Sequence, residues 1–309
     1  MKRKVLITTS SFDLSNFHQL NELTAAGIEI LQNPLHRRLN EQEVTNLLTD
    51  DVIGMIAGLE PLTAAVMTHA RELKVIARCG AGLDSVDLDA ARNQGIAIFN
   101  TPDAPTTAVA ELTLAHILGL LRHVTQSDRE IRSGKWSGLM GSLLKNKIVG
   151  IVGFGRIGQA VARLVSAFDA TVVAYDIQAI SAPNVRQLDL VELCSQSDIV
   201  TLHVPYSRDT HHMINEDVLK QMKSTALLIN VSRGGVIDED ALLESLQNEH
   251  IAGAALDCFE AEPYSGPLLN LKNVHVTAHM GSYAREARDQ MEIDASAALV
   301  RGLREQGIL

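Results

Sequence analysis

The sequence predicts an α/β protein built from two doubly wound parallel sheets. The chain has 309 residues, which is longer than one ordinary domain and favours two domains in one polypeptide. Short β-rich runs alternate with longer helical patterns almost from end to end, as in proteins with parallel sheets. Several runs are continuous in Val, Ile and Leu without polar alternation, which is typical of parallel strands buried on both faces.

The predicted strands fall into two series. The first series comprises residues 5–8, 28–31, 53–57, 75–77 and 97–100. The second comprises residues 148–152, 171–175, 199–203, 226–229, 253–256 and 274–277. Helical patterns such as "ELTLAHILGLLRHV" and "DEDALLESLQNEH" lie between strands, so each series predicts its own sheet with covering helices.

The segment "IFNTPDAPTTAVAELT" marks the domain boundary. Its Asn-Thr-Pro and Ala-Pro dipeptides break the pattern before a long apolar helix begins near Thr107. Residues 282–309 read as a helix that is too short to form a domain, so this helix must pack on a unit already built. We therefore expect residues 1–99 and 282–309 to form one discontinuous domain, with residues 100–281 inserted into it.

The composition, with 46% hydrophobic and 21% charged residues and a net charge of −10, suits a globular protein. The charge argues against binding to nucleic-acid phosphates or to an anionic membrane surface. Cys79, Cys194 and Cys258 have no CxxC spacing, which excludes a disulfide framework or a zinc cluster and fits the reducing cytoplasm. The apolar run near the N-terminus is too short for a signal peptide, and no run approaches a membrane-spanning length. A cytoplasmic protein is expected.

The segment "KIVGIVGFGRIGQAVARLVSAFDATVVAYDIQ" predicts a dinucleotide-binding site. A strand runs into the Gly-x-Gly-x-x-Gly sequence, and a helix and a second strand ending in Asp176 follow. Gly153 permits a tight turn, Gly155 lets the backbone approach a pyrophosphate, and Gly158 lets the helix pack closely on the strand. The N–H groups and the dipole at the helix N-terminus would hold the diphosphate charge.

Asp176 lies 18 residues after Gly158, where a carboxylate accepts both hydroxyls of the adenine ribose and repels a 2′-phosphate. NAD is therefore the expected cofactor, in preference to NADP. A second glycine-rich stretch, "GAGLDS" at residues 80–85, also follows a strand but lacks a third glycine and a later acidic strand end. It is either a loop whose backbone N–H groups face a ligand or an ordinary turn, and its spacing does not decide.

Polar residues follow several strands of the second series, at the edge where an open parallel sheet places its chemistry. Arg233 follows one strand, Asp257 ends another with Glu260 and Glu262 beyond it, and His279 follows the last. An arginine, a carboxylate and a histidine in one crevice suit hydride transfer between NAD and a 2-hydroxy acid. The histidine can carry the proton, the carboxylate can orient the ring, and the guanidinium can hold the substrate carboxylate or polarise the 2-oxo group.

Each of these residues also has a structural interpretation. Arg233 could be a surface charge beside a Gly-Gly turn, and His279 could be a hydrogen-bonded residue without a catalytic role. Spacing does not distinguish Glu260 from Glu262 as the partner carboxylate. His275 lies inside the last strand and is expected to pack or hydrogen-bond there. No histidine has metal-ligand spacing beside carboxylates, so no metal is expected.

Six blocks in order along nearly the whole chain resemble the D-isomer-specific 2-hydroxyacid dehydrogenase family, most closely its phosphoglycerate dehydrogenase-like branch. The blocks are "RCGAGLDSVDLDAA", "NTPDAPTTAVAELTLA", "GKWSGLMGSLLKNKIVGIVGFGRIG", "LINVSRGGVIDEDAL", "AGAALDCFEAEP" and "VTAHMGS". The resemblance implies an NAD-binding Rossmann domain inserted into a discontinuous flavodoxin-like substrate domain. It also implies an oxidoreductase that interconverts a D-2-hydroxy acid and its 2-oxo acid, and a homodimer with the helix after Asn100 in its interface.

The resemblance also implies roles for single residues. The family's catalytic arginine falls on Arg233, its proton-carrying histidine on His279, and its carboxylate on Glu262, the acid before a proline. The Ala81 and Gly82 amides would bind the substrate carboxylate together with Arg233. The diphosphate would lie at Arg156-Ile157, the nicotinamide carboxamide at Asp257, and a cofactor phosphate at Thr106. The full set of expected cofactor contacts is Thr106, Gly153, Gly155, Arg156, Ile157, Gly158, Asp176, Val204, Val231, Ser232, Asp257 and Gly281.

Some features depart from the family pattern. The stretch "AGLEPLT" has Gly58, Leu59 and Glu60 where phosphoglycerate dehydrogenases usually carry a basic residue, so phosphoglycerate or phosphohydroxypyruvate would lack its usual anchor. Ala278 stands where proline is usual, and a chain ending at Leu309 is expected to lack the C-terminal regulatory domain. Candidates for contact with the substrate side chain are "AGLEPLT" and residues 136–140, which we expect among first-domain loops.

Two other functions remain open from the sequence. One is an NAD(H)-sensing binding protein with little turnover, like the transcriptional corepressors built on this fold. The other is formate dehydrogenase, whose relatives replace the carboxylate partner with glutamine. The intact trio of Arg233, Glu262 and His279 argues against the first, and Glu262 argues against the second.

Overall fold

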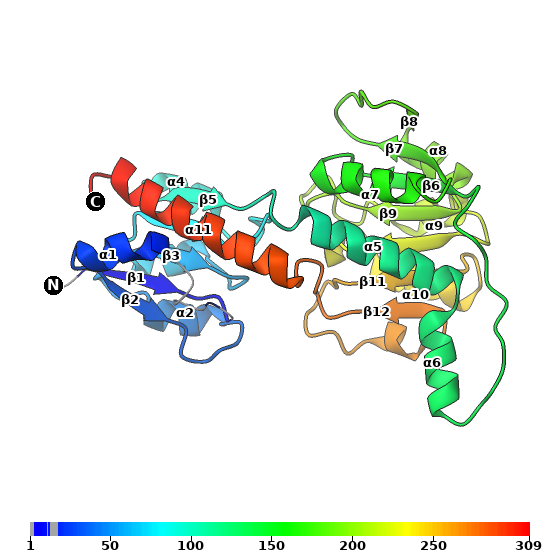
Figure 1. Cartoon of the computed structure of the whole chain (residues 1–309), viewed down its shortest axis with the longest axis horizontal. Coiled ribbons are helices and arrows are strands. Elements are labelled where there is room, and N and C mark those ends of the chain that lie inside the picture. The colour runs from blue at the N-terminus through cyan, green and yellow to red at the C-terminus, as the bar shows by residue number, and fades with distance from the viewer. Residues whose placement is uncertain (1–2, 11, 13–17) are drawn as a thin grey trace. The chain divides into compact units, whose positions relative to one another are not determined.

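The computed structural model describes residues 3–10, 12 and 18–309. The chain divides into two units, one of Met1–Pro105 with Ala284–Leu309 and one of Thr106–Tyr283 (Figure 1). Both boundaries lie slightly later in the chain than the predicted ones. None of the helices in the described ranges is long and apolar enough to span a membrane.

The first unit contains a five-stranded parallel sheet in the order β2-β1-β3-β4-β5. Its strands are β1 (Lys4–Ile7), β2 (Glu29–Gln32), β3 (Val52–Ala57), β4 (Val75–Arg78) and β5 (Ala97–Asn100). All residues of β3 and β4 are buried, as expected of central strands covered on both faces. One face packs on α1 (Asn21–Ala25) and α11 (Arg285–Glu305), and the other on α2 (Glu41–Leu47), α3 (Ala64–His69) and α4 (Leu88–Asn93).

Helix α11 returns the C-terminal segment to the first unit. It contacts β3, β4 and β5, and its apolar face, with Leu299 and Leu303 completely buried, covers the sheet. Gly302 makes the close approach possible, because a Cβ there would lie 2.6 Å from the Phe99 ring. The discontinuous unit is therefore held together by ordinary core packing.

The second unit contains a seven-stranded parallel sheet in the order β12-β11-β10-β9-β6-β7-β8. Its strands are β6 (Ile148–Val152), β7 (Thr171–Tyr175), β8 (Val185–Gln187), β9 (Ile199–Leu202), β10 (Leu227–Asn230), β11 (Gly253–Leu256) and β12 (Val274–Val276). From β6 the chain adds β7 and β8 on one side of the sheet and then β9 to β12 on the other. The topological switch point therefore lies between β6 and β9, where open sheets bind their ligands.

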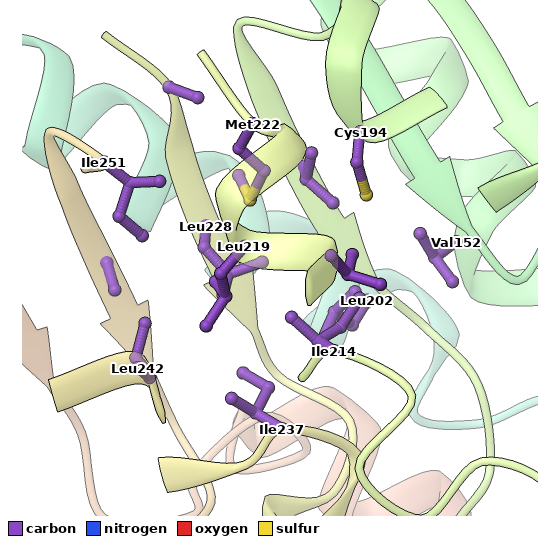
Figure 2. Close-up of a cluster of buried hydrophobic side chains, with 14 of the residues drawn as sticks. Val152, Cys194, Leu202, Ile214, Leu219, Met222, Leu228, Ile237, Leu242 and Ile251 are labelled. Carbon is purple, nitrogen blue, oxygen red and sulfur yellow. The ribbon is translucent and has the colours of Figure 1, made fainter. Parts of the chain in front are cut away.

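Helices cover both faces of this sheet. One core lies under α5 (Thr106–Leu121) and α7 (Arg156–Ser166). The other, shown in Figure 2, lies under α8 (Leu190–Gln196), α9 (Glu216–Gln221) and α10 (Glu239–Gln247) and includes Val152, Leu202 and Leu228. The remaining elements are α6 (Val124–Arg132), η2 (His18–Leu20), η3 (Gly234–Val236) and η4 (Pro267–Asn270).

The structure confirms the predicted fold class of two parallel-sheet α/β units. Each of the eleven predicted strands has a counterpart that agrees within one residue at both ends. The edge strand β8 was missed because Val185-Arg186-Gln187 is short and mostly polar, which does not stand out from a loop.

Candidate active site

The glycine-rich loop has the geometry predicted from its sequence. Gly153 follows β6 with φ of 92°, and a Cβ there would lie 2.7 Å from the His203 carbonyl oxygen. A Cβ on Gly158 would lie 2.2 Å from the Gly153 carbonyl oxygen, whereas a Cβ on Gly155 would meet nothing within 4 Å. The loop therefore needs two glycines for its own packing and one that leaves its outer side open, as a diphosphate cradle requires.

Helix α7 begins at this loop, with Gly155 as its N-cap and Arg156 and Ile157 in its first turn. The N–H groups and positive dipole end of an eleven-residue helix thus face the open side of the glycine loop. Val204, at the end of β9, packs beside Gly153, since a Cβ on that glycine would lie 2.9 Å from its side chain. The glycine loop after β6 and Val204 after β9 therefore lie on the two sides of the switch point.

Asp176 is fixed at the end of β7. Its Oδ2 accepts a hydrogen bond of 2.7 Å from the Phe154 N–H, and its Oδ1 accepts one of 2.9 Å from the Gln178 N–H. The carboxylate is therefore attached to the glycine loop and still half-buried rather than enclosed. This is the position from which a carboxylate reaches an adenine ribose.

The loop after β10 carries Val231, Ser232 and Arg233. The side chain of Asn230 shapes it, because Oδ1 accepts from the Ser232 N–H and hydroxyl and Nδ2 donates to the Arg233 carbonyl. The Arg233 guanidinium donates to the Ser232 carbonyl at 2.7 Å. Gly234 lets this loop rest directly on the Phe259 backbone, since a Cβ there would lie 1.9 Å from the Phe259 carbonyl carbon.

His279 and Glu262 are in direct contact. The His279 Nδ1 atom lies 2.9 Å from both Glu262 carboxylate oxygens, and the two side chains are 29% and 23% exposed. The Glu262 carboxylate also accepts a hydrogen bond of 3.2 Å from the Phe259 N–H. Because Nδ1 faces the carboxylate, Nε2 is the ring nitrogen left to meet a ligand.

The other candidate carboxylate, Glu260, has a different partner. It lies 2.6 Å from the His212 Nε2 atom, and its backbone N–H donates to Glu239. His212 stacks on His211 with 3.8 Å between ring centroids. The alternative that spacing left open is thus resolved by geometry, since Glu262 and not Glu260 contacts His279.

The turn that carries His279 is wrapped around the side chain of Asp257. This buried carboxylate accepts from the Thr277 hydroxyl at 2.5 Å, the Met280 N–H at 2.9 Å and the Gly281 N–H at 2.8 Å. The His279 N–H donates to the Asp257 carbonyl, and His279 has a left-handed φ of 50°. Such a conformation is unfavourable for a non-glycine residue and persists only where the surroundings impose it.

Thr277 extends this network into helix α5. Its Oγ1 atom lies 3.2 Å from the His116 Nε2 atom, and burial lowers the pKa of His116. The ring is therefore neutral near neutral pH, and with its proton on Nε2 it donates to Thr277, whose own hydroxyl donates to Asp257. Neither residue was predicted as part of the site. Thr277 lies in the block "VTAHMGS" without a role of its own, and His116 lies 161 positions away from it in the sequence.

The remaining second-unit candidates are placed as follows. His275 is buried and lies 2.5 Å through Nε2 from the Thr125 hydroxyl, and burial lowers its pKa to about 4. Its predicted structural role is confirmed. Thr106 begins α5, and its buried hydroxyl has no hydrogen-bond partner in the part of the chain that the structure describes. Trp136 and Met140 lie in the second unit, not among first-domain loops as predicted, and are 91% and 93% exposed.

In the first unit, Ala81 and Gly82 lie in the loop after β4. Within the described residues, neither backbone N–H donates to a protein acceptor, so both can donate hydrogen bonds to a carboxylate. Arg78, which is 5% exposed, lies beneath the preceding residue, since a Cβ on Gly80 would lie 2.6 Å from the Arg78 Nη1 atom. The predicted substrate-carboxylate loop is therefore backed by a cation.

Taken together, the second unit presents a glycine cradle at a switch point, a carboxylate beside it, and an imidazole oriented by a second carboxylate. An imidazole with one nitrogen fixed by a carboxylate is a general acid or base for a ligand at the other nitrogen. A guanidinium on the neighbouring strand end supplies a fixed positive charge.

Comparisons with known proteins agree with this geometry. The model of the D-isomer specific 2-hydroxyacid dehydrogenase, NAD binding domain, matches residues 114–281. Glyoxylate reductase of Thermofilum pendens is 41% identical over 258 residues, covering 79% of this chain and 76% of the relative.

Two solved structures share the whole architecture. The TT0316 protein of Thermus thermophilus is 35% identical with a TM-score of 0.89, covering 98% of this chain and 97% of the other. D-lactate dehydrogenase of Aquifex aeolicus, in complex with NAD and lactic acid, is 27% identical with a TM-score of 0.84, covering 98% and 96%. The chain therefore belongs to the D-isomer specific 2-hydroxyacid dehydrogenase family.

Proposed function

We propose that this chain is an NAD-dependent oxidoreductase that interconverts a D-2-hydroxy acid and its 2-oxo acid, with His279 as the proton donor and acceptor. The observation that carries the proposal is the contact of the His279 Nδ1 atom with both oxygens of Glu262 at 2.9 Å. It orients the ring so that Nε2 is presented to the substrate oxygen. The names of similar proteins, glyoxylate reductase and D-lactate dehydrogenase among them, support an enzyme over an NAD(H)-sensing protein.

The residues present fit NAD. The Gly155 side of the loop is open, the α7 N-terminus offers its N–H groups to a diphosphate, and the Asp176 carboxylate suits ribose hydroxyls. Thr106 would contact a cofactor phosphate through a hydroxyl that has no other described partner. The remaining proposed contacts are Arg156, Ile157, Val204, Val231, Ser232, Asp257 and Gly281. When bound, the nicotinamide accepts hydride from the 2-hydroxy acid or returns it to the 2-oxo acid.

The chain's own groups manage the proton and the substrate charge. In reduction, protonated His279 donates from Nε2 to the oxygen of the 2-oxo group, while Glu262 stabilises the charged ring. Arg233 holds the substrate carboxylate or polarises the 2-oxo group, and the Ala81 and Gly82 amides bind the carboxylate. In oxidation His279 removes the same proton.

The test measures NADH oxidation by the full-length protein with a panel of 2-oxo acids, and the readout is the loss of NADH absorbance. His279→Gln should lower kcat by about 10²–10⁴-fold, the usual contribution of a general acid, while NADH binding measured by fluorescence persists. His250→Gln, which changes an exposed histidine, is the matched control. If His279→Gln and Arg233→Gln both turned over like wild type, the proposed roles would be wrong. NADH binding without turnover of any 2-oxo acid would favour the sensor.

We also propose that the chain acts as a homodimer in the cytoplasm. Trp136, Met140 and Leu143 follow α6 and are 91%, 93% and 65% exposed, and such exposed apolar groups mark interaction surfaces. Its three cysteines are free and buried, which suits a reducing compartment. Light scattering should give twice the chain mass for wild type and a shift toward monomer for Trp136→Glu. A wild-type monomer would contradict the dimer.

A further inference from the structure

The carboxyl ends of the first unit's strands are where its sheet is expected to bind ligands. In the order β2-β1-β3-β4-β5 the chain passes from β1 to β2 on one side and then to β3 on the other. The switch point therefore lies between β1 and β3, where flavodoxin-like sheets hold their ligand. Thr8 follows β1, residues 58–62 follow β3, and the Ala81–Gly82 loop follows β4.

The loops after β3 and β4 are joined to each other. The Cys79 N–H donates to the Ala57 carbonyl at 2.9 Å, and the Leu62 N–H donates to the Ser85 carbonyl at 2.7 Å. A substrate whose carboxylate is held by the Ala81 and Gly82 amides therefore lies beside the loop after β3. That loop is the nearest surface for the rest of a 2-oxo acid.

A buried carboxylate lies directly behind this surface. Glu60 is 1% exposed, and its Oε1 atom accepts from the Gly58 N–H at 3.0 Å and from the Thr8 hydroxyl. The Thr8 hydroxyl has one proton and lies within hydrogen-bond distance of both Glu60 Oε1 and the Ile56 carbonyl oxygen. A Cβ on half-buried Gly58 would lie 2.8 Å from Glu60 Oε2, so the carboxylate lies directly against the Gly58 backbone. The Gly58 N–H is also engaged by Glu60 and does not serve an anion.

The two loops thus differ in the charge that lies behind them. Arg78 lies beneath Gly80, next to the amides of Ala81 and Gly82, and its guanidinium donates to the Cys79 carbonyl. The Cys79 thiol lies near charges of both signs, those of Arg78 and Arg288 and those of Glu60 and Glu292, and Arg288 is paired with Glu292 at 3.0 Å. Residues 58–63 contain no lysine or arginine. The arrangement favours one anionic group at the β4 loop and disfavours another at the β3 loop.

We propose that Glu60 determines substrate specificity, so that the enzyme prefers 2-oxo acids with a small uncharged side chain over those with a second negative charge. This inference rests on the proposed function and narrows its substrate class. Hydroxypyruvate and phosphohydroxypyruvate are the matched probes, because they differ only by the phosphate group. The negative potential behind Gly58 raises the free energy of the bound acid whose side chain carries the phosphate. It has a smaller effect on hydroxypyruvate, whose side chain is uncharged and whose carboxylate is held at the β4 loop.

The experiment compares kcat/KM for the two acids with wild type, Glu60→Gln and Glu72→Gln, all full length and with saturating NADH. Glu60→Gln keeps the shape and an acceptor oxygen for Gly58 and Thr8 but removes the charge. Glu72→Gln removes an equal charge from an exposed residue just before β4, at the amino ends of the strands and away from the Ala81–Gly82 loop. Wild type should prefer hydroxypyruvate, and Glu60→Gln should raise the relative use of phosphohydroxypyruvate by about tenfold, or about 1.4 kcal/mol. Glu72→Gln should not change the ratio.

The outcomes separate this inference from the proposed function. Wild type using both acids equally well would overturn the inference alone, and this result needs no variant to fold. A Glu60→Gln ratio equal to that of Glu72→Gln would also overturn it, because the discrimination would then have another source. If wild type reduced no 2-oxo acid, the proposed function would fail and the inference with it.

Discussion

Replacing Thr277 by valine tests whether the buried network positions the turn that carries His279. Valine has nearly the same shape but can neither donate to Asp257 nor accept from His116. The Thr277 hydroxyl donates to the Asp257 carboxylate at 2.5 Å and lies 3.2 Å from the His116 Nε2 atom. Asp257 and His116 are 1% and 6% exposed, so water does not readily replace the lost partner.

The magnitude follows from these contacts. A hydrogen bond to a charged group contributes about 1.5–3 kcal/mol, and leaving the buried His116 N–H without an acceptor costs about 1–3 kcal/mol. The added methyl group returns up to about 1 kcal/mol by burial. We therefore expect Thr277→Val to lower the free energy of unfolding by about 3 kcal/mol. Because His279 has a left-handed φ of 50°, loosening the turn should also lower kcat more than it raises the KM for the 2-oxo acid.

The assay is urea unfolding of the full chain followed by circular dichroism, together with steady-state kinetics. Thr171→Val is the matched control, because Thr171 begins β7 with an exposed side chain and should change stability by less than about 0.5 kcal/mol. If Thr277→Val were as stable as this control and kept the wild-type kcat, the network would not position the turn, and the reasoning would be refuted.

Four further substitutions test single features of the structure. Asp176→Ser should raise the preference for NADPH relative to NADH by at least about tenfold, because it removes the charge that repels a 2′-phosphate; unchanged relative KM values would contradict this. Gly153→Ala should destabilise the fold by about 3 kcal/mol, since φ is 92° and a Cβ would lie 2.7 Å from a backbone oxygen. Gly155→Ala has open space and should keep its melting temperature but weaken NADH binding, as thermal melting and a fluorescence titration would reveal. Burial lowers the pKa of His275 from 6.5 to about 4. The contribution of His275 to the free energy of unfolding is therefore constant above pH about 6.5. The protein loses up to about 3 kcal/mol of this free energy as the pH falls toward 4, because the unfolded chain binds the proton first. His275→Gln should flatten this part of a stability–pH curve, and an unaltered slope would show that the ring does not contribute to it.

Sequence patterns were sufficient to predict features that depend on residues close together in the chain. The buried strands, the glycine spacing and the acid at the end of β7 could all be read from residues close together in the chain, since strand burial and turn geometry impose their own composition. The three-residue edge strand β8 could not, because its pairing with β7 depends on the neighbour rather than on an apolar pattern of its own.

The choice between Glu260 and Glu262 required the path of the loop after β11. Two residues apart in sequence, these carboxylates point to different histidines, His212 and His279, which lie 48 and 17 positions away from them. Spacing alone does not determine which side of a loop a side chain takes. The family resemblance pointed to Glu262, and the contact at 2.9 Å gives that choice a physical basis.

By itself the sequence determined the fold class, the strands and the glycine loop, because hydrophobic burial and backbone sterics act over short stretches of chain. Only the tertiary structure decided that Asp257 anchors the His279 turn, that Thr277 and His116 extend this anchor, and that Glu60 lies behind Gly58. The contacts of Asp257, Thr277 and His116 join strand ends and a helix that are far apart in sequence, and Glu60 is held by Thr8 from another strand end. The packing of each parallel sheet brings these residues together.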